Sequence, residues 1–310
     1  MQLSTLLLAP LLTGTLSQTT TASLPLRLVT FNIRYAATSL STGEKPWSDR
    51  TCTASNPTPC RKVLLNQLST IISTAPSNAT TLIGLQEVLS SQLTDIKSHL
   101  GPSWSHIGIG RDDGNTRGEY SPILYRNDLL TLLFSETKWL SPTPDTPSFG
   151  WNAGSRRVVT LGVFESKATG KRFIHANTHL DNASAQARTE GIKVALGRVE
   201  AAQRAWGPLG VVLTGDFNSA RGAEAHKVVA DGGTMEELFD VASAEGKIKG
   251  TNRATFTGFR PGTLTFIDFV WVGPKGGRRF GLQGYEIWDN VVQGVYVSDH
   301  RAVVGDVMLI

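Results

Sequence analysis

The stretch VVLTGDFN (residues 211–218) shows the pattern that decides the fold: an apolar run ends in an acid, Asp216, and an amide, Asn218. Runs of Val, Leu, Ile and Phe are typical of buried strands, in which a carboxylate has no favourable place. An acid at the end of such a strand is costly unless a cation or a hydrogen-bonded histidine compensates it. The stretch therefore predicts a strand that delivers Asp216 to a functional site.

Five further stretches repeat this pattern along the chain. They are VTFN (29–32), IGLQE (83–87), IHANTHLD (174–181), FID (266–268) and VSDH (297–300). The six stretches span residues 29–300, so one site would draw on almost the whole chain. We therefore expect a single domain over residues 24–310.

Oxygen ligands gather at these strand ends. Hard divalent cations prefer carboxylate and amide oxygens, and Glu87, Asp216, Asp299 and Asn32 supply both types from separate strands. Each residue alone has a structural explanation, such as a strand cap for Asn32 or a solvated acid at a helix start for Glu87. Their combination favours a site for Mg²⁺ or Mn²⁺.

The stretch NTHLD (177–181) adds a second histidine. The two-residue period of a strand places Asn177, His179 and Asp181 on one side. These three residues are expected to approach one cavity. His175 lies two residues before Asn177 along the strand, further from its end, and is expected to be structural.

Many expected strands alternate with helices, which indicates two packed sheets covered by helices. Helical periodicity marks 61–74, 90–100, 183–206 and an interval near 223–242. The Pro-rich stretch SPTPDTPSFG (141–150) is expected to be a surface loop. Phe149 and Trp151 are expected to anchor this loop by packing, with an aromatic tip for lipid or base stacking as the alternative.

The composition fits a globular protein of ordinary core size. Of the 310 residues, 40% are apolar and 18% are charged. The formal charge of +4 is mildly basic and allows an acidic partner. The sequence has no block of five like charges, so no nucleic-acid-binding tail is indicated.

Three features predict a secreted protein. Residues 1–23 carry no charged side chain and contain a short Leu-rich core, as in a secretory signal peptide, although the usual basic start is missing. Cys52 and Cys60 lie in a polar loop and would form a local disulfide, with two free thiols as the alternative. Asn78 and Asn182 begin glycosylation sequons. The Leu-rich run is too short to span a bilayer, for which ~18 apolar residues are needed.

The motifs FNIRY, LQEV, NTHLD, GDFN, IDFVWV and SDHR, in this order, resemble the endonuclease/exonuclease/phosphatase superfamily over about residues 26–310. This superfamily contains DNase I-like nucleases, sphingomyelinases and inositol polyphosphate phosphatases. The resemblance implies an α/β fold: a four-layer α/β/β/α sandwich with two packed, mostly antiparallel or mixed sheets. The active site would lie between the open ends of these sheets.

The resemblance also implies roles for individual residues. Glu87 would be the principal metal ligand with Asn32 beside it, and Asp299 would help to place the metal or the histidine. Asp216 would orient or deprotonate the attacking water. His300, supported by Asp268, would donate a proton. The remaining implied contacts are Asn218 to the water or a phosphate oxygen, His179 as a second histidine, and Asn177 to phosphate.

Arg34 stands where abasic-site endonucleases carry an acid, and it offers a planar fork for phosphate instead. The pattern of FNIRY, then Trp47 and Arg50, then GEYSPILYR (118–126) resembles a secreted bacterial and fungal branch of the superfamily. The expected substrate-binding residues surround these motifs: Arg34, Trp47, Arg50, Glu119, Asp181 and Arg188. Arg156 and Arg157 are further candidates to face an anion.

The sequence therefore predicts a secreted phosphoester hydrolase, most simply a phosphodiesterase, that depends on Mg²⁺ or Mn²⁺. The substrate stays open between a nucleic acid, a phospholipid or inositol headgroup and another soluble phosphodiester. The small net charge and the absence of a basic run favour a compact anionic phosphodiester, or the end of a single strand, over processive cutting of double-stranded DNA. A binding module without turnover is the alternative from another class, and the complete set of acids and histidines argues against it.

Overall fold

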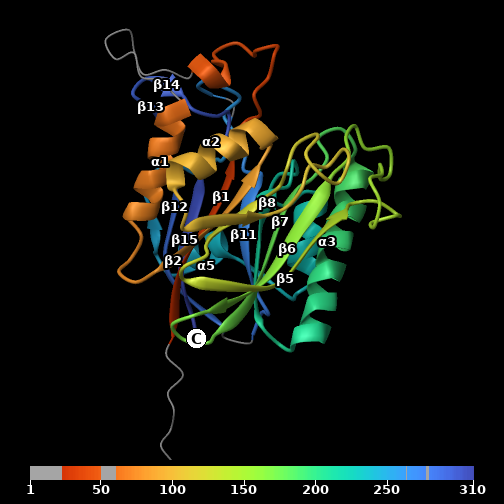
Figure 1. Ribbon diagram of the computed structural model, residues 1–310, viewed down its shortest axis with the longest axis vertical. Coiled ribbons are helices and arrows are strands. Elements are labelled where there is room, and N and C mark those ends of the chain that lie inside the picture. Colours follow the sequence, from red (N-terminus) through yellow and green to blue (C-terminus); the bar gives the residue numbers. More distant parts are fainter. Residues whose placement is uncertain (1–22, 50–60, 263, 277–278) are drawn as a thin grey trace, which may run out of the picture.

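The computed structural model describes residues 23–49, 61–262, 264–276 and 279–310, which form two β-sheets packed face to face (Figure 1). The first sheet has the strand order β10 (Ile248–Lys249), β12 (Phe280–Ile287), β15 (Val303–Leu309), β1 (Leu24–Asn32), β2 (Thr80–Gln86), β4 (Ile123–Arg126), β3 (Trp104–Ile107). The second has the order β5 (Leu130–Trp139), β6 (Val158–Ser166), β7 (Arg172–His179), β8 (Gly210–Asp216), β11 (Asp268–Gly273), β9 (Glu236–Glu237). A small hairpin joins β13 (Val291–Val292) and β14 (Val295–Tyr296).

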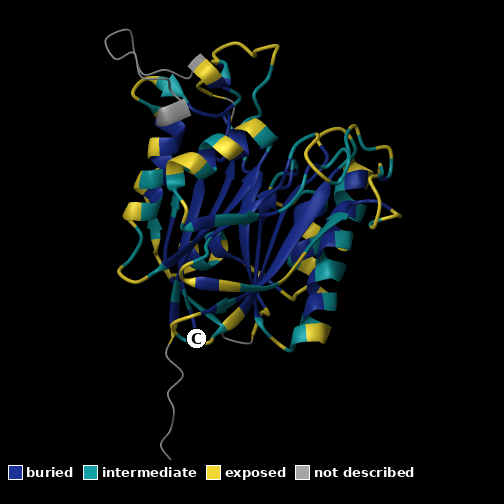
Figure 2. Cartoon of the chain, in the orientation of Figure 1, coloured by how far each residue is buried: buried dark blue, intermediate teal, exposed yellow. Residues whose placement is uncertain are grey.

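Both sheets are mixed and mostly antiparallel, with parallel pairs at β1–β2, β10–β12 and β7–β8. Helices cover the outer faces: α1 (Arg61–Ser73) and α2 (Ser90–Leu100) on the first sheet, and α3 (Ala185–Trp206) and α4 (Glu224–Asp231) on the second. The short α5 (Leu238–Ala244) contacts β11 and β12, one from each sheet. Figure 2 shows the sheets buried and the outer faces of the helices exposed. The predicted four-layer sandwich is confirmed.

Alternation along β1 distributes its side chains between two cores. Leu26 and Leu28 pack between the sheets, whereas Val29 and Phe31 pack under the outer helices. Continuing this period places Asn32 on the inner side, at the end where the sheets open. A strand with apolar residues on both faces thus ends in a polar side chain that points between the sheets.

The two sheets approach closely at Gly84 in β2. A Cβ at this position would lie 2.4 Å from the Thr214 hydroxyl and 2.6 Å from the Asn177 side-chain oxygen. Any larger residue would therefore push β2 away from β7 and β8. This contact lies two residues before the end of β2, directly beneath the strand ends that carry the acids.

The structure corrects one expected helix and adds strands. The interval near 223–242 is split into α4 and α5 because Gly232 and Gly233 follow α4 and Glu237 then pairs with Trp271 in β9–β11. The sequence pattern did not indicate β5 or β12, in which exposed polar residues and glycines weaken the apolar signal. Within the described part of the chain, no helix has both the length and the apolar character needed to cross a membrane.

A buried ion pair joins β1 to β15. Arg27 donates to both carboxylate oxygens of Asp306 at 2.7 Å, and its Nη1 donates to the Ile71 carbonyl of α1. Both charged side chains are only 6% exposed. The pair therefore ties two strands and the covering helix together at a place that water does not reach.

Asp306→Asn should lower the free energy of unfolding by about 3–5 kcal/mol, because it leaves the Arg27 guanidinium buried without a counter-charge. Asp128→Asn is the matched control: it breaks the surface pair with Arg126, in which the side chains are 32% and 41% exposed, and should cost less than about 1 kcal/mol. Urea unfolding followed by circular dichroism measures both. Equal shifts in the two variants would contradict the assigned role of the buried pair.

Candidate functional site

The acids and histidines meet at one end of the sandwich. β1, β2, β7 and β8 end there, and β11 begins there. Asp216 is the register partner of both His179 and Asp268. Across the sheets, Asn32 Nδ2 donates to Asp216 Oδ2 at 2.9 Å. The structure therefore brings Asn32, Glu87, His179, Asp216, Asp268 and His300 into one site.

Asn32 bridges two carboxylates. Its Nδ2 donates to Glu87 Oε1 at 3.1 Å as well as to Asp216, and its Oδ1 accepts from the Arg34 backbone N–H at 3.0 Å. The amide oxygen thus faces the backbone of the chain and the nitrogen faces the acids. This differs from the predicted ligand role: in the structure Asn32 holds the carboxylates together as a donor.

Glu87 lies just past the end of β2. Strand alternation would point its side chain toward the helix-covered face, with Leu85. A left-handed backbone with φ 58° ends the strand instead, and the carboxylate reaches Asn32 and accepts from the Tyr35 N–H at 3.2 Å. Arg34 Nη1 lies 3.8 Å from Glu87 Oε2, and the Glu87 side chain keeps 13% of its surface exposed.

Asp268, His300 and Asp216 form a second group. His300 Nδ1 lies 2.9 Å from Asp268 Oδ2, and its Nε2 lies 3.6 Å from Asp216 Oδ2. Burial disfavours the imidazolium, but the charges of Asp268 and Asp216 raise the pKa of His300 well above its usual value. Burial and the charge of Asp268 raise the pKa of Asp216 to about 7. The 3.6 Å separation couples the titration of Asp216 to that of His300.

His179 lies on the other side of Asp216. Its Nε2 is 3.4 Å from Asp216 Oδ2 and 2.9 Å from Asn218 Nδ2, and its Nδ1 is 3.8 Å from Glu119 Oε2. Burial, together with the nearby Arg157 and Arg111, lowers the pKa of His179 well below its usual value. A neutral ring that accepts from Asn218 at Nε2 carries its proton at Nδ1, facing Glu119.

Glu119 is held by Arg111 through two hydrogen bonds of 2.8 Å. Burial and the charge of Glu87 raise the pKa of Glu119, and Arg111 opposes them. Burial also raises the pKa of Asp299; His300 opposes this shift and Glu87 adds to it. The Glu87 carboxylate thus lies close enough to both Glu119 and Asp299 for its charge to add to the raised pKa of each.

Three non-glycine residues at this end have a left-handed backbone. They are Arg34 with φ 58°, Glu87 with φ 58° and Asn218 with φ 46°, which follow β1, β2 and β8. Such conformations cost about 1–3 kcal/mol each and persist where the surrounding structure enforces them. The Asn218 backbone N–H, for example, is fixed by Asp216 Oδ1 at 2.8 Å.

Asn177 lies below the site rather than in it. Its Nδ2 donates to the Leu85 carbonyl at 2.8 Å and to the Pro122 carbonyl at 3.0 Å, and its Oδ1 accepts from Gln86 and Thr214. Both amide hydrogens and both lone pairs are used, so the predicted phosphate contact is not available. His175 is also internal, as expected, and burial lowers its pKa to about 3.

Three predicted substrate contacts have structural partners instead. Trp47 is buried under the first sheet's helices, and its Nε1 donates to Asp95 at 2.9 Å. Asp181 accepts backbone N–H groups of Gly154, Ser155, Ala183 and Ser184 and so fixes the start of α3. Arg188 pairs with Glu224 and with the Asp181 carbonyl. These side chains hold loops and helices in place around the site.

Arg34 lies at the site, but its guanidinium is paired with a carboxylate. It donates to both carboxylate oxygens of Glu44, at 2.9 and 3.2 Å. The sequence pattern did not predict this ion pair. Phe149 is 52% exposed, so the expectation that it packs as a loop anchor is wrong. Asn78 and Asn182 are exposed. Arg50, the Cys52–Cys60 link and residues 1–22 lie outside the described residues.

The donor set fits a hard divalent cation. Asp216, Asp268 and His300 offer ligand atoms within 4.8 Å of one another, but both nitrogens of His300 face carboxylates, an arrangement better suited to moving a proton. Glu87 and Asp216, which Asn32 bridges, are carboxylates of the type that a hard cation prefers. Asp268 Oδ1 is buried with no hydrogen-bond partner among the described residues, which also indicates a polar species at this end.

Sequence reasoning did not single out Arg111, Glu44 or Gln86. Gln86 had a usable signal, because alternation in β2 places it with Gly84 on the inner face, where it donates to Asn177 at 2.8 Å. Arg111 and Glu44 lie in irregular loops, where no periodic pattern relates them to the strand ends.

Comparisons with known proteins agree with this geometry. The model of the Endonuclease/Exonuclease/phosphatase family matches residues 29–300. A search of curated proteins found no match.

Three solved structures of similar fold are bacterial. A family protein from Bacteroides thetaiotaomicron is 26% identical with a TM-score of 0.77, over 93% of this chain and 96% of that one. A mannosyl-6-phosphatase of the same species is 27% identical with a TM-score of 0.75, over 91% and 99%. A family protein from Bacteroides vulgatus is 29% identical with a TM-score of 0.74, over 92% and 99%. With the family match covering most of the chain, the protein belongs to the endonuclease/exonuclease/phosphatase family.

Proposed function

We propose that the protein hydrolyses the phosphoester of a compact, polyhydroxylated molecule such as a sugar, with the help of a divalent cation. One observation carries the proposal. Asn32 holds Glu87 and Asp216 together, and Asp216 Oδ2 lies 3.6 Å from Nε2 of His300, which is paired with Asp268. This arrangement combines oxygen ligands with a proton donor and acceptor. Family members are hydrolases of phosphoesters, which fits that chemistry.

Glu87 and Asp299 are the proposed ligands of Mg²⁺ or Mn²⁺. When bound, the cation supplies positive charge that stabilises the phosphoryl oxygens. Asp216 takes the proton of the attacking water, and Asn218 fixes the carboxylate through its backbone N–H. His300, oriented by Asp268, donates a proton to an oxygen of the phosphoryl or leaving group. His179 accepts from Asn218 at Nε2 and carries its proton at Nδ1, so it donates to a phosphate oxygen through Nδ1.

Two observations support a compact substrate. The structure 27% identical to this chain is a mannosyl-6-phosphatase that aligns over 91% of it. Arg34 and Arg111, the arginines nearest the acids, are both paired with carboxylates, so they do not form a free basic track for a long polyanion. A nuclease activity is the alternative outcome of the following test.

The test is a panel of phosphoesters at neutral pH with Mg²⁺ or Mn²⁺: hexose 6-phosphates, a phosphodiester, inositol phosphates, single-stranded DNA and supercoiled plasmid. We expect the highest kcat/KM on a hexose phosphate. Activity should disappear with EDTA and return with either cation. Undiminished activity after exhaustive chelation contradicts the cation, and nicking of plasmid at a higher rate than any small ester contradicts the substrate class.

Asp216→Asn and His300→Ala should each lower kcat by ~10²–10⁴-fold, because they remove the proton acceptor and the proton donor. The exposed residues His99 and Asp231 provide matched controls, and His99→Ala and Asp231→Asn should leave kcat unchanged. Steady-state kinetics on the best substrate, with circular dichroism to confirm folding, measure the effect. A folded Asp216→Asn protein with near-normal kcat would contradict the assignment.

A further inference from the structure

Two loops flank the His179 side of the site. The loop between β3 and β4 contains Glu119, whose carboxylate is 3.8 Å from His179. The loop between β5 and β6 is tied to Asp181, two residues after His179, through the N–H groups of Gly154 and Ser155 at 3.2 Å each. Figure 1 shows both loops at the end of the sandwich where β1 and β7 terminate. They therefore lie beside His179 at the rim of the site.

Side chains from the two loops form one contact network. Arg156 Nη1 lies 3.8 Å from Asp112 Oδ1, and the Arg156 guanidinium lies 4.6 Å above the centre of the Phe149 ring. Arg156 Nε is buried with no hydrogen-bond partner among the described residues. Trp139 Nε1 also donates to the Arg111 carbonyl at 2.7 Å. The loops are thus fixed against each other before any ligand binds.

The backbone of both loops fits this fixed arrangement. A Cβ at Gly118, where φ is 81°, would lie 2.6 Å from the Asp112 carboxyl carbon. Only glycine therefore leaves room for the Asp112 side chain in this position. Trp151 and Asn152 have φ of 47° and 60°, and a bulky residue in that region is costly. Strain of this kind gathers at ligand-binding loops.

The network leaves an apolar surface beside a carboxylate. Phe149 is 52% exposed, although Arg156 covers it on one side, and the Asp112 side chain is 43% exposed. An aromatic ring packs against the C–H face of a sugar, and a carboxylate accepts hydrogen bonds from its hydroxyl groups. The neighbouring acids Asp112 and Asp113 would repel a second phosphate.

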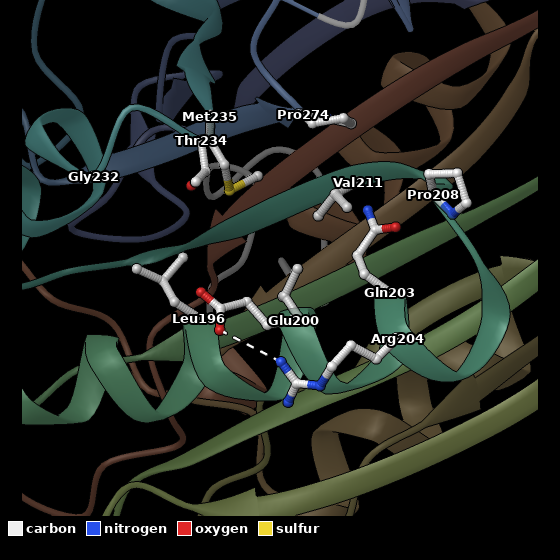
Figure 3. Close-up of a pocket in the computed structure, with 12 residues that line it drawn as sticks. Leu196, Glu200, Gln203, Arg204, Pro208, Val211, Gly232, Thr234, Met235 and Pro274 are labelled. Carbon is white, nitrogen blue, oxygen red and sulfur yellow. Dashed lines mark ion pairs between the residues drawn. The ribbon is translucent and has the colours of Figure 1, made fainter.

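We propose that Phe149 and Asp112 form a specificity subsite that binds the sugar ring of the leaving group, with Arg156 holding both in position. This inference rests on the proposed function and adds the residues that select the leaving group. The apolar cavity of about 480 Å³ in Figure 3 is a weaker candidate. It lies at the opposite end of β8 and β11, and nothing in the described residues indicates its occupant.

The test compares hexose 6-phosphate with glycerol 3-phosphate, which has hydroxyl groups but no ring. Phe149→Ala should lower kcat/KM for the hexose ester about five- to tenfold, mainly by raising KM. It should change kcat/KM for glycerol 3-phosphate less than about twofold. Phe149→Trp should restore the hexose value. Asp112→Ala should lower kcat/KM for the hexose ester by about tenfold. Phe134→Ala, which truncates an exposed Phe on β5, is the matched control and should leave the ratio of the two substrates unchanged.

The proposal is overturned if Phe149→Ala leaves the ratio of kcat/KM for the two substrates unchanged. It is also overturned if the wild-type protein does not hydrolyse hexose 6-phosphate. Its failure is distinguishable from failure of the proposed function. A wild-type protein that cleaves some other phosphoester, and loses that activity on Asp216→Asn, keeps the hydrolase function without this subsite.

Discussion

The close approach of the two sheets at Gly84 is the constraint on which the site depends. Only a glycine at this position lets Asn177 and Thr214 of the second sheet reach the first. Asn177 then bonds to the Leu85 carbonyl and to Gln86, which fixes the separation of β2 from β7 and β8. The strand ends that carry Glu87 and Asp216 follow within one to three residues, so their spacing is inherited from this buried layer.

Hydrogen-bond and ion-pair partners explain how so many buried acids are tolerated at this end of the sandwich. Buried carboxylates are costly unless they are paired, and here each has a named partner. Asn32 and the Tyr35 N–H serve Glu87, Arg111 serves Glu119, and His300 serves Asp268. Burial, together with repulsion from Asp268 or Glu87, raises the pKa values of Asp216, Asp299 and Glu119. A cation between the carboxylates would relieve that repulsion, which is the physical reason to place one there.

The strand ends were predictable because apolar runs that stop at a polar residue are a local signal. That signal identified Glu87, Asp216, Asp268 and His300 as a set, and the structure brings them together. It did not reveal the contacts of residues whose partners lie in loops or on helices. Asp181 is the last residue of NTHLD, yet its carboxylate accepts hydrogen bonds from backbone N–H groups of two loops. Trp47 and Arg188 resembled anion contacts by position, but their partners Asp95 and Glu224 are distant in sequence and have no periodic relation to them.

The proposed mechanism requires that the strand-end carboxylates hold a divalent cation beside Glu87. Anomalous diffraction from crystals soaked in Mn²⁺ locates such a cation. We expect an anomalous peak within about 2.0–2.3 Å of a Glu87 carboxylate oxygen, with Asp299 or Asp216 completing the ligand set and His300 Nδ1 still bonded to Asp268. A peak coordinated by His300 instead, or no peak near Glu87 at millimolar Mn²⁺, would contradict it.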